Sequence, residues 1–206
     1  MSKLLVATRN PAKLREYKDI LANFSLQILA LEDLGIEQDV AETASTIAEN
    51  ALLKANSYVL LSGLPTLADD SGLEIDALNG WPGVHSRRVW GEAQREATDE
   101  EALAEVMRRM HDIPQERRGA CFVVVSVLAL PTGERYTGTA TTLGSIAMEP
   151  RGIPAIGFPY RRLFIPQGST KTHGELTPKD KATGYLNHRK KAILELEPYF
   201  KMLERL

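Results

Sequence analysis

The sequence predicts an α/β protein built around a mixed β-sheet. A short apolar run, Lys3–Ala7, is followed at once by helix-starting residues, which is typical of a strand that feeds a helix. Capping boxes that begin at Thr46 and Thr98 predict two further helices. A Val-rich segment, Ala120–Leu130, ends in turn residues and is followed by a second extended segment, which indicates a hairpin. Helices alternating with such strands favour an α/β sheet of mixed direction.

Composition excludes several function classes. The 206 residues are 43% hydrophobic and 25% charged, as in an ordinary globular protein. The formal net charge of −2 disfavours duplex DNA as a partner, and one cysteine, Cys121, cannot form an internal disulfide. The longest nearly apolar run, Ala120–Leu130, is shorter than the roughly 20 residues of a membrane span, and the N-terminus lacks signal-peptide features. We therefore expect a cytoplasmic, soluble protein without nucleic-acid or membrane partners.

The first elements follow from local signals. Lys3–Ala7 is expected to form a buried strand, and Asn10 to cap a helix that has Pro11 in its first turn. Leu26–Leu31 is expected to form a second strand. Apolar residues at helical spacing form the buried stripe of the first helix: Leu14, Tyr17, Ile20, Leu21 and Phe24.

The second helix is expected to begin near Thr46, where Thr46 and Glu49 have capping-box spacing, and to stop at Gly63-Leu64-Pro65. Two short strands, Thr66–Ala68 and Leu73–Ala77, are then predicted on either side of an Asp69–Gly72 turn. The core-facing stripe of this helix comprises Ile47, Ala51, Ala55 and Val59.

A third helix is expected from Thr98 to Met110, followed by the central strand Ala120–Leu130 and its hairpin partner Arg135–Thr142. Frequent Gly and Pro predict an irregular region at Glu149–Gly168. The last helix is expected to start near Asn187 and to be interrupted at Pro198. With no repeat and no long linker, residues 1–206 are expected to form a single domain.

The loop Thr8–Lys13 is the first candidate site. Backbone N–H groups and the positive end of the dipole gather where a strand feeds a helix, which suits a phosphate. Lys13 is a cation where a helix prefers an acid, so an anionic ligand would offset that penalty. The alternative interpretation is a capped helix with a solvated lysine.

A second candidate combines Glu42 with Glu49, Asn50 and Lys54. Asn50 and Lys54 are four residues apart and lie on one face of a helix. The alternative interpretation is an exposed, solvated face.

The third candidate is the pair Asp69 and Asp70, which follows an apolar segment. Buried carboxylates need a cation or hydrogen bonds, and hard oxygen ligands favour Mg²⁺. Such a carboxylate can also accept a proton from an attacking water. The alternative interpretation is a surface turn, since Asp-Ser-Gly is turn composition.

The fourth candidate groups Lys181 with His188 and Arg189 near the start of the last helix. An arginine presents a planar fork of donors for a carbonyl or phosphate, and a histidine can donate or accept. The alternative interpretation is a surface pair.

In order, these segments resemble the inosine triphosphate pyrophosphatase family. Ala7–Lys13 matches the family pattern Ala-Thr/Ser-x-Asn-x-x-Lys, and Glu49–Ala55 matches Glu-Asn-Ala-x-x-Lys-Ala, with Glu42 preceding it. Ala68–Leu73 matches Ala-Asp-Asp-Ser-Gly-Leu. Pro82–Arg88 is similar to Pro-Gly-Val/Ile-Tyr-Ser-x-Arg, with a histidine at the tyrosine position. The resemblance covers nearly the whole chain.

The resemblance implies an elongated mixed sheet flanked by helices, with two lobes and a central cleft (Maf/Ham1 type), and a homodimer. It implies a Mg²⁺-dependent enzyme that hydrolyses ITP, dITP and XTP to the monophosphate and pyrophosphate. Asp70, Asp69 and Lys54 would be catalytic, and Glu42 and Asp70 would hold Mg²⁺. Substrate would be bound by Thr8, Arg9, Asn10, Lys13, Ser71, Phe158, Tyr160, Arg161, Lys181, His188 and Arg189.

Two segments depart from the family pattern. The family's Gly-Phe-Gly-Tyr-Asp-Pro is here Gly157–Arg162, in which Phe158 keeps the aromatic platform for the base. Pro159 replaces a glycine, and Arg161 replaces an acid that lies at the base pocket in the family. The segment between Lys181 and His188 is two residues longer than in the family pattern.

Two alternatives follow from these departures. One keeps the fold and the phosphate chemistry but acts on another nucleotide, such as one with a modified base or a pyrimidine. The other is a non-catalytic protein that binds nucleotides. The Maf-like pyrophosphatases share the architecture, but their Ser-Pro-Arg-Arg after the first strand is absent from this sequence.

Overall fold

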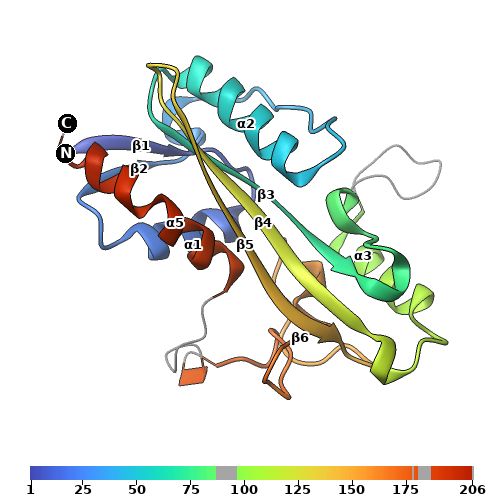
Figure 1. Cartoon of the computed structure of the whole chain (residues 1–206). Coiled ribbons are helices and arrows are strands. Elements are labelled where there is room, and N and C mark those ends of the chain that lie inside the picture. Colours follow the sequence, from blue (N-terminus) through green and yellow to red (C-terminus); the bar gives the residue numbers. More distant parts are fainter. Residues whose placement is uncertain (87–96, 178, 181–186, 206) are drawn as a thin grey trace. The chain divides into compact units, whose positions relative to one another are not determined.

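The computed structural model describes residues 1–86, 97–177, 179–180 and 187–205 (Figure 1). The helices in this part are α1 (Pro11–Leu21), α2 (Ile47–Ser62), α3 (Asp99–Arg109) and α5 (His188–Leu203). The strands are β1 (Ser2–Val6), β2 (Leu26–Leu29), β3 (Thr66–Ile75), β4 (Gly119–Ala129), β5 (Arg135–Ile146) and β6 (Phe164–Pro166). No helix among the described residues is both long enough and apolar enough to cross a bilayer.

The strands form one mixed sheet, in the order β2-β1-β3-β4-β5-β6. β1 pairs in parallel with both β2 and β3, so that Leu4 lies opposite Ile28 and Val6 opposite Leu67. β4 and β5 are neighbours joined by a tight turn, and β6 pairs antiparallel with β5. The predicted α/β class, the mixed sheet and the central hairpin are confirmed.

The chain divides into two compact units. The first comprises Met1–Asp70, Val124–Ala140 and His188–Leu206, and the second comprises Ser71–Val123 and Thr141–Asn187. The chain passes between them inside β3, β4 and β5 and just before α5.

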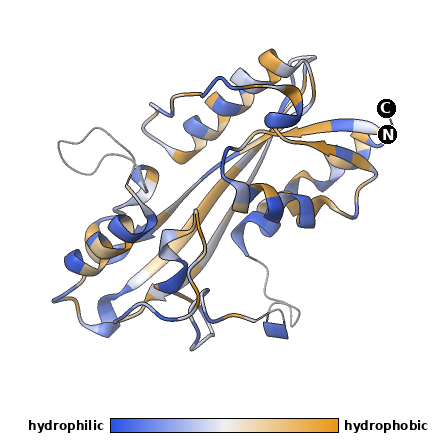
Figure 2. Ribbon diagram, turned by 180° about the vertical axis from the view of Figure 1, so that it is seen from behind, coloured by the Kyte–Doolittle hydropathy of each residue, from blue (hydrophilic) through white to orange (hydrophobic). Residues whose placement is uncertain are grey.

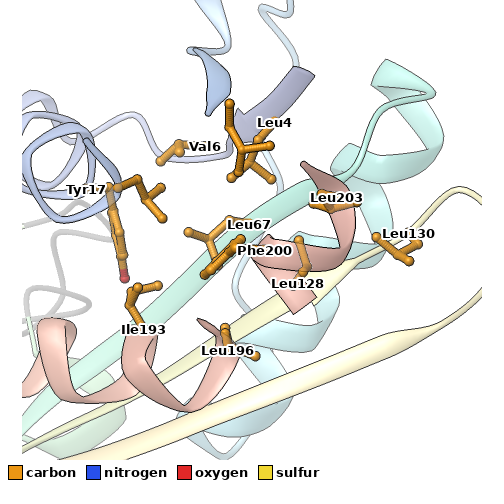
Figure 3. Packing of buried hydrophobic residues seen from close by; sticks show 12 residues of the cluster. Leu4, Val6, Tyr17, Leu67, Leu128, Leu130, Ile193, Leu196, Phe200 and Leu203 are labelled. Atoms are coloured by element: carbon orange, nitrogen blue, oxygen red, sulfur yellow. The ribbon is translucent and has the colours of Figure 1, made fainter. Parts of the chain in front are cut away.

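The first unit has a core in which α5 supplies a large share of the side chains (Figure 3). Its buried face packs with residues of β1, α1, β3 and β4. Hydrophilic residues are common along the helices, whereas the central strands carry many hydrophobic ones (Figure 2). The labelled core residues are Leu4, Val6, Tyr17, Leu67, Leu128, Leu130, Ile193, Leu196, Phe200 and Leu203.

The second unit has its own core between α3, the ends of three strands and the segment before β6. Its fully buried members include Leu73, Val106, Ile146 and Phe164. Arg118 is also buried there, and its guanidinium donates to the carbonyl oxygens of three residues: Met110, Ile113 and Ala147.

The helix starts agree with their sequence signals. Asn10 caps α1, and the boxes at Thr46 and Thr98 are complete, each with its glutamate bonded back to the cap. Gly63 ends α2 with φ of 64°, a left-handed conformation in which glycine has no side chain to clash. Local capping chemistry therefore sets these boundaries.

The predicted turn at Asp69–Gly72 is wrong. β3 is a single ten-residue strand through this segment, and both Asp69 and Asp70 are buried. Turn composition is overridden here because cationic side chains from distant helices meet the two carboxylates, as described below. A charge that has such partners can be buried in a strand.

Two other predictions need correction. α5 continues through Pro198 instead of breaking there. Pro198 lies on the exposed side of the helix, and the buried residues Leu196, Phe200 and Leu203 hold the following turn against the core. The irregular region Glu149–Gly168 also contains the short strand β6.

Candidate active site

The loop between β1 and α1 is fixed by its own side chains. Thr8 Oγ1 accepts the Asn10 N–H (3.2 Å), and Asn10 Oδ1 accepts the N–H groups of Ala12 (2.9 Å) and Lys13 (3.2 Å). Pro11 has no N–H to offer. The first-turn amides predicted to bind phosphate are thus already hydrogen-bonded within the loop. The loop carries two cations, the exposed Arg9 and Lys13, and the Lys13 ammonium forms an ion pair with Asp69.

The side chains of Asp69 and Asp70 lie on opposite faces of β3. Neighbouring side chains of a strand point to opposite sides of the sheet. Asp69 meets Lys13 of α1 and Arg189 of α5, whereas Asp70 meets Lys54 of α2. The adjacent carboxylates therefore belong to two charge clusters, not one.

The Asp69 cluster is an extended ion-pair network inside the first unit. Lys13 Nζ lies 3.0 Å from Asp69 Oδ2, and Arg189 Nε lies 3.5 Å from the same oxygen. Arg189 also donates from Nη1 to Glu16 Oε2 at 3.0 Å. Only 1% of the Asp69 side chain and 4% of the Arg189 side chain are exposed, so these charges are shielded from solvent. The network joins α1, β3 and α5.

Protonation in this network is governed by burial and by the opposing charges. Burial alone would raise the pKa of Asp69, but Lys13, Arg189 and Lys54 together hold it well below its usual value of 3.8. Burial lowers the pKa of Lys13, against the attraction of Asp69. The nearby Tyr17 hydroxyl is buried, donates to or accepts from Ser126 Oγ, and has its pKa raised. Asp69 therefore stays ionised down to acid pH.

The second cluster lies on the α2 face of the sheet. Lys54 Nζ donates to Glu42 Oε1 at 3.0 Å and lies 3.6 Å from Asp70 Oδ1. Only 11% of the Lys54 side chain and 6% of the Asp70 side chain are exposed. Glu42 comes from the irregular segment before α2, so three separate segments of the chain supply this cluster.

Glu42 and Asp70 are the two carboxylates of this cluster that could hold a divalent cation. The Lys54 ammonium already shows that both carboxylates reach one positive charge. Among the described residues, no group of three or more His, Cys, Asp or Glu side chains could hold a metal. Two carboxylates nevertheless suit Mg²⁺, which keeps several waters and is completed by substrate phosphates.

The remaining predicted residues of the first unit have different surroundings. Arg9 is exposed and donates to the carbonyl oxygens of Ile36 (3.3 Å) and Gln38 (2.7 Å), so it holds the segment after β2. His188 is buried at the first turn of α5, beside Arg189. Lys181 lies outside the described residues.

Four of the predicted substrate residues that the structure describes belong to the second unit. Tyr160 is buried in its core and donates to the Ser86 carbonyl oxygen, so its hydroxyl is engaged within the fold. Ser71, Phe158 and Arg161 are half-buried. The Nε atom of Arg161 is enclosed and has no hydrogen-bond partner among the described residues.

Sequence reasoning missed Glu16 and Tyr58. Glu16 lies three residues after Lys13, so both face the same side of α1, and this spacing was an available signal. Tyr58 extends the Asn50–Lys54 spacing by one more turn and is bonded to the segment that carries Glu42. Glu49, in contrast, is used by the capping box of α2.

Comparison with known proteins agrees with this architecture. The dITP/XTP pyrophosphatase of Mycobacteroides abscessus is 40% identical over 207 residues, covering 99% of this chain and 97% of that protein. That of Frankia alni is 41% identical, covering 94% and 95%. The solved structure of the Staphylococcus aureus Ham1 protein superposes with a TM-score of 0.80 at 30% identity, covering 98% and 99% of the two chains. The Ham1 family model matches residues 4–199, and the chain therefore belongs to the Ham1 family.

Proposed function

We propose that this enzyme of the Ham1 family is a Mg²⁺-dependent nucleoside triphosphate pyrophosphatase that acts on non-standard purine nucleotides, with dITP, XTP and ITP as substrates. The observation that carries the proposal is the convergence of Glu42 and Asp70 on the Lys54 ammonium. The similarity to proteins named dITP/XTP pyrophosphatase supports the substrate class.

The reaction needs charge neutralisation, a proton acceptor and a leaving group. Glu42 and Asp70 would hold Mg²⁺, which when bound neutralises charge on the phosphate oxygens. Lys54 and Lys13 add fixed positive charge for the triphosphate, as phosphoryl transfer requires. Asp70 accepts a proton from the attacking water as the water oxygen bonds to the α-phosphorus. The bond from the α-phosphorus to the bridging oxygen breaks, and pyrophosphate leaves with that oxygen.

A second candidate function is the same reaction on a nucleotide with a different base. Arg161 supplies a hydrogen-bond donor where the inosine triphosphate pyrophosphatase pattern has an acid. Its enclosed Nε atom has no hydrogen-bond partner among the described residues. If Arg161 determines base preference, then Arg161→Asp shifts the ratio of kcat/KM values towards inosine and xanthosine triphosphates. An unchanged ratio would exclude Arg161 as the determinant.

The deciding experiment is pyrophosphate release from a panel of nucleoside triphosphates, with and without Mg²⁺. We expect release from ITP, dITP and XTP to exceed release from the four standard nucleotides and to need Mg²⁺. Asp70→Asn should remove most of this activity, and near-wild-type release by that variant would refute the role given to Asp70. Nucleotide binding by calorimetry without turnover would instead favour a non-catalytic binding protein.

A further inference from the structure

A polar stripe on α2 faces the segment that carries Glu42. Asn50, Lys54 and Tyr58 are four residues apart, which places them on one side of the helix. All three side chains are buried, although each is polar. A buried polar stripe is unusual, because polar residues ordinarily lie on the exposed face of a helix.

Each member of the stripe binds a successive point of the preceding segment. Asn50 bonds to Ala44, Lys54 to Glu42 and Tyr58 to Gln38. The partners' numbers fall as the helix numbers rise, so residues 38–44 run back along α2. Glu42 is therefore held between two anchored points, Ala44 and Gln38.

The Asn50 side-chain amide bonds to both backbone polar groups of Ala44, as a neighbouring strand would. Its Oδ1 accepts the Ala44 N–H at 3.0 Å, and its Nδ2 donates to the Ala44 carbonyl oxygen at 3.5 Å. Residues 38–44 have no helix or strand, so these backbone groups depend on side chains for hydrogen bonds. Tyr58 donates its hydroxyl to the Gln38 carbonyl oxygen at 3.2 Å at the other end. A leucine at either position could fill the space but could not make these bonds.

We infer that Asn50 and Tyr58 are positioning residues that set the Glu42 carboxylate for the divalent cation it shares with Asp70. The inference rests on the proposed function, because it assigns two supporting residues to the same cation site. Asn50 and Tyr58 act through the backbone at Ala44 and Gln38, whereas Lys54 contacts the carboxylate itself. Without Asn50, the Ala44 backbone loses both of its bonds to the amide, whereas at Gln38 the Tyr58 hydroxyl shares the carbonyl oxygen with Arg9.

The test uses the full chain with Asn50→Ala and Tyr58→Phe, and Mn²⁺ as the probe in a calorimetric titration with a non-hydrolysable nucleoside triphosphate analogue. We expect each variant to raise the Kd for Mn²⁺ about tenfold, the lower end of the loss seen when groups supporting metal ligands are removed. The Mg²⁺ concentration for half-maximal activity should rise in parallel, while kcat at saturating Mg²⁺ stays within about twofold of wild type.

The controls remove the same chemical groups elsewhere in the first unit. Asn56→Ala removes an amide on α2 that bonds to Arg135, and Tyr136→Phe removes a hydroxyl from a ring stacked on Tyr199. Both should leave the Kd for Mn²⁺ unchanged. Hydrogen exchange adds a second readout, since the Ala44 amide should exchange faster in Asn50→Ala than in either control. If Asn50→Ala does not fold, Tyr58→Phe, which removes one oxygen atom, still decides the question.

Two results would overturn the inference. One is an unchanged Kd for Mn²⁺ in folded Asn50→Ala and Tyr58→Phe, whatever happens to their melting temperatures. The other is wild-type protein that binds no Mn²⁺, which would also remove the cation from the proposed function. If Mn²⁺ binding depends on both anchors but no nucleotide in the panel is hydrolysed, the positioning role stands and the proposed reaction fails.

Discussion

At the scale of single residues, the most informative feature is the division of labour between Asp69 and Asp70. One peptide unit separates them, yet Asp69 is enclosed with Lys13 and Arg189 while Asp70 shares Lys54 with Glu42. Asp69 therefore ties three elements together, whereas Asp70 is the carboxylate to which we assign the cation and the attacking water in the proposed reaction. Substitution of Asp69 should therefore change mainly the stability of the protein, and substitution of Asp70 mainly its activity.

Lys54→Met tests the charge at the cation cluster. It keeps the length of the side chain but removes the ammonium that faces Glu42 and Asp70. We expect kcat for pyrophosphate release to fall by about 100-fold, the scale of losing one fixed charge-stabilising group. The half-saturating Mg²⁺ concentration should not rise, since the two carboxylates lose a competing cation. Steady-state kinetics over a Mg²⁺ series would measure both quantities, and a fall in kcat below threefold would contradict the assignment.

Asp69→Asn should alter stability in a pH-dependent way. The pKa of Asp69 is lower in the folded protein than its usual value of 3.8, so its stabilisation is complete above that value and is lost as pH falls. At pH 7 the variant leaves the buried Lys13 without its carboxylate and Arg189 with Glu16 as its carboxylate partner in this network, at a cost of about 3–5 kcal/mol. Urea unfolding from pH 7 to pH 2 should show the gap between variant and wild type narrowing below about pH 4. A gap independent of pH would argue against an ionised Asp69.

At the level of helices and strands, the starts of α1, α2 and α3 followed their local signals, and the long strand β3 did not. The caps at Asn10, Thr46 and Thr98 need only residues close in sequence, so they are predictable. β3 passes through Asp69–Gly72 because its carboxylates are neutralised by side chains from three helices, which no local pattern reports. α5 likewise tolerates Pro198 because the residues beyond it are anchored in the core.

The crossing of β5 and α5 depends on a glycine. A Cβ atom at Gly138 would lie 2.1 Å from the Ala192 carbonyl oxygen, closer than any real contact allows. Gly138→Ala should therefore lower the free energy of unfolding by about 1–3 kcal/mol, as overpacking does. Thr137→Ala, an exposed neighbour on β5, should stay within about 0.5 kcal/mol of wild type. Chemical denaturation of both variants provides the comparison, and equal stabilities would show that the two elements separate at little cost.

For the molecule as a whole, we propose a homodimer, as the family resemblance implies. A chain of 22.8 kDa should then sediment with about twice that mass at micromolar concentration. Sedimentation equilibrium measures this directly, and a monomer at all concentrations would remove the homodimer from the expectations. Pyrophosphate release measured at the same concentrations would show whether activity follows assembly.

Sequence patterns alone predict the α/β class, the starts of α1, α2 and α3, the central hairpin and the motifs that indicate a nucleotide enzyme. These depend on periodicity and on contacts between near neighbours, which the order of residues encodes directly. Other features are visible only in the folded protein. Asp69 and Asp70 face opposite sides of β3, and Arg189 joins Glu16 to Asp69. Asn50 and Tyr58 bind the segment that carries Glu42. Each of these outcomes rests on buried polar groups whose partners lie far away in sequence. Burial is tolerated only once those partners meet, so local composition alone pointed to a turn or a solvated face.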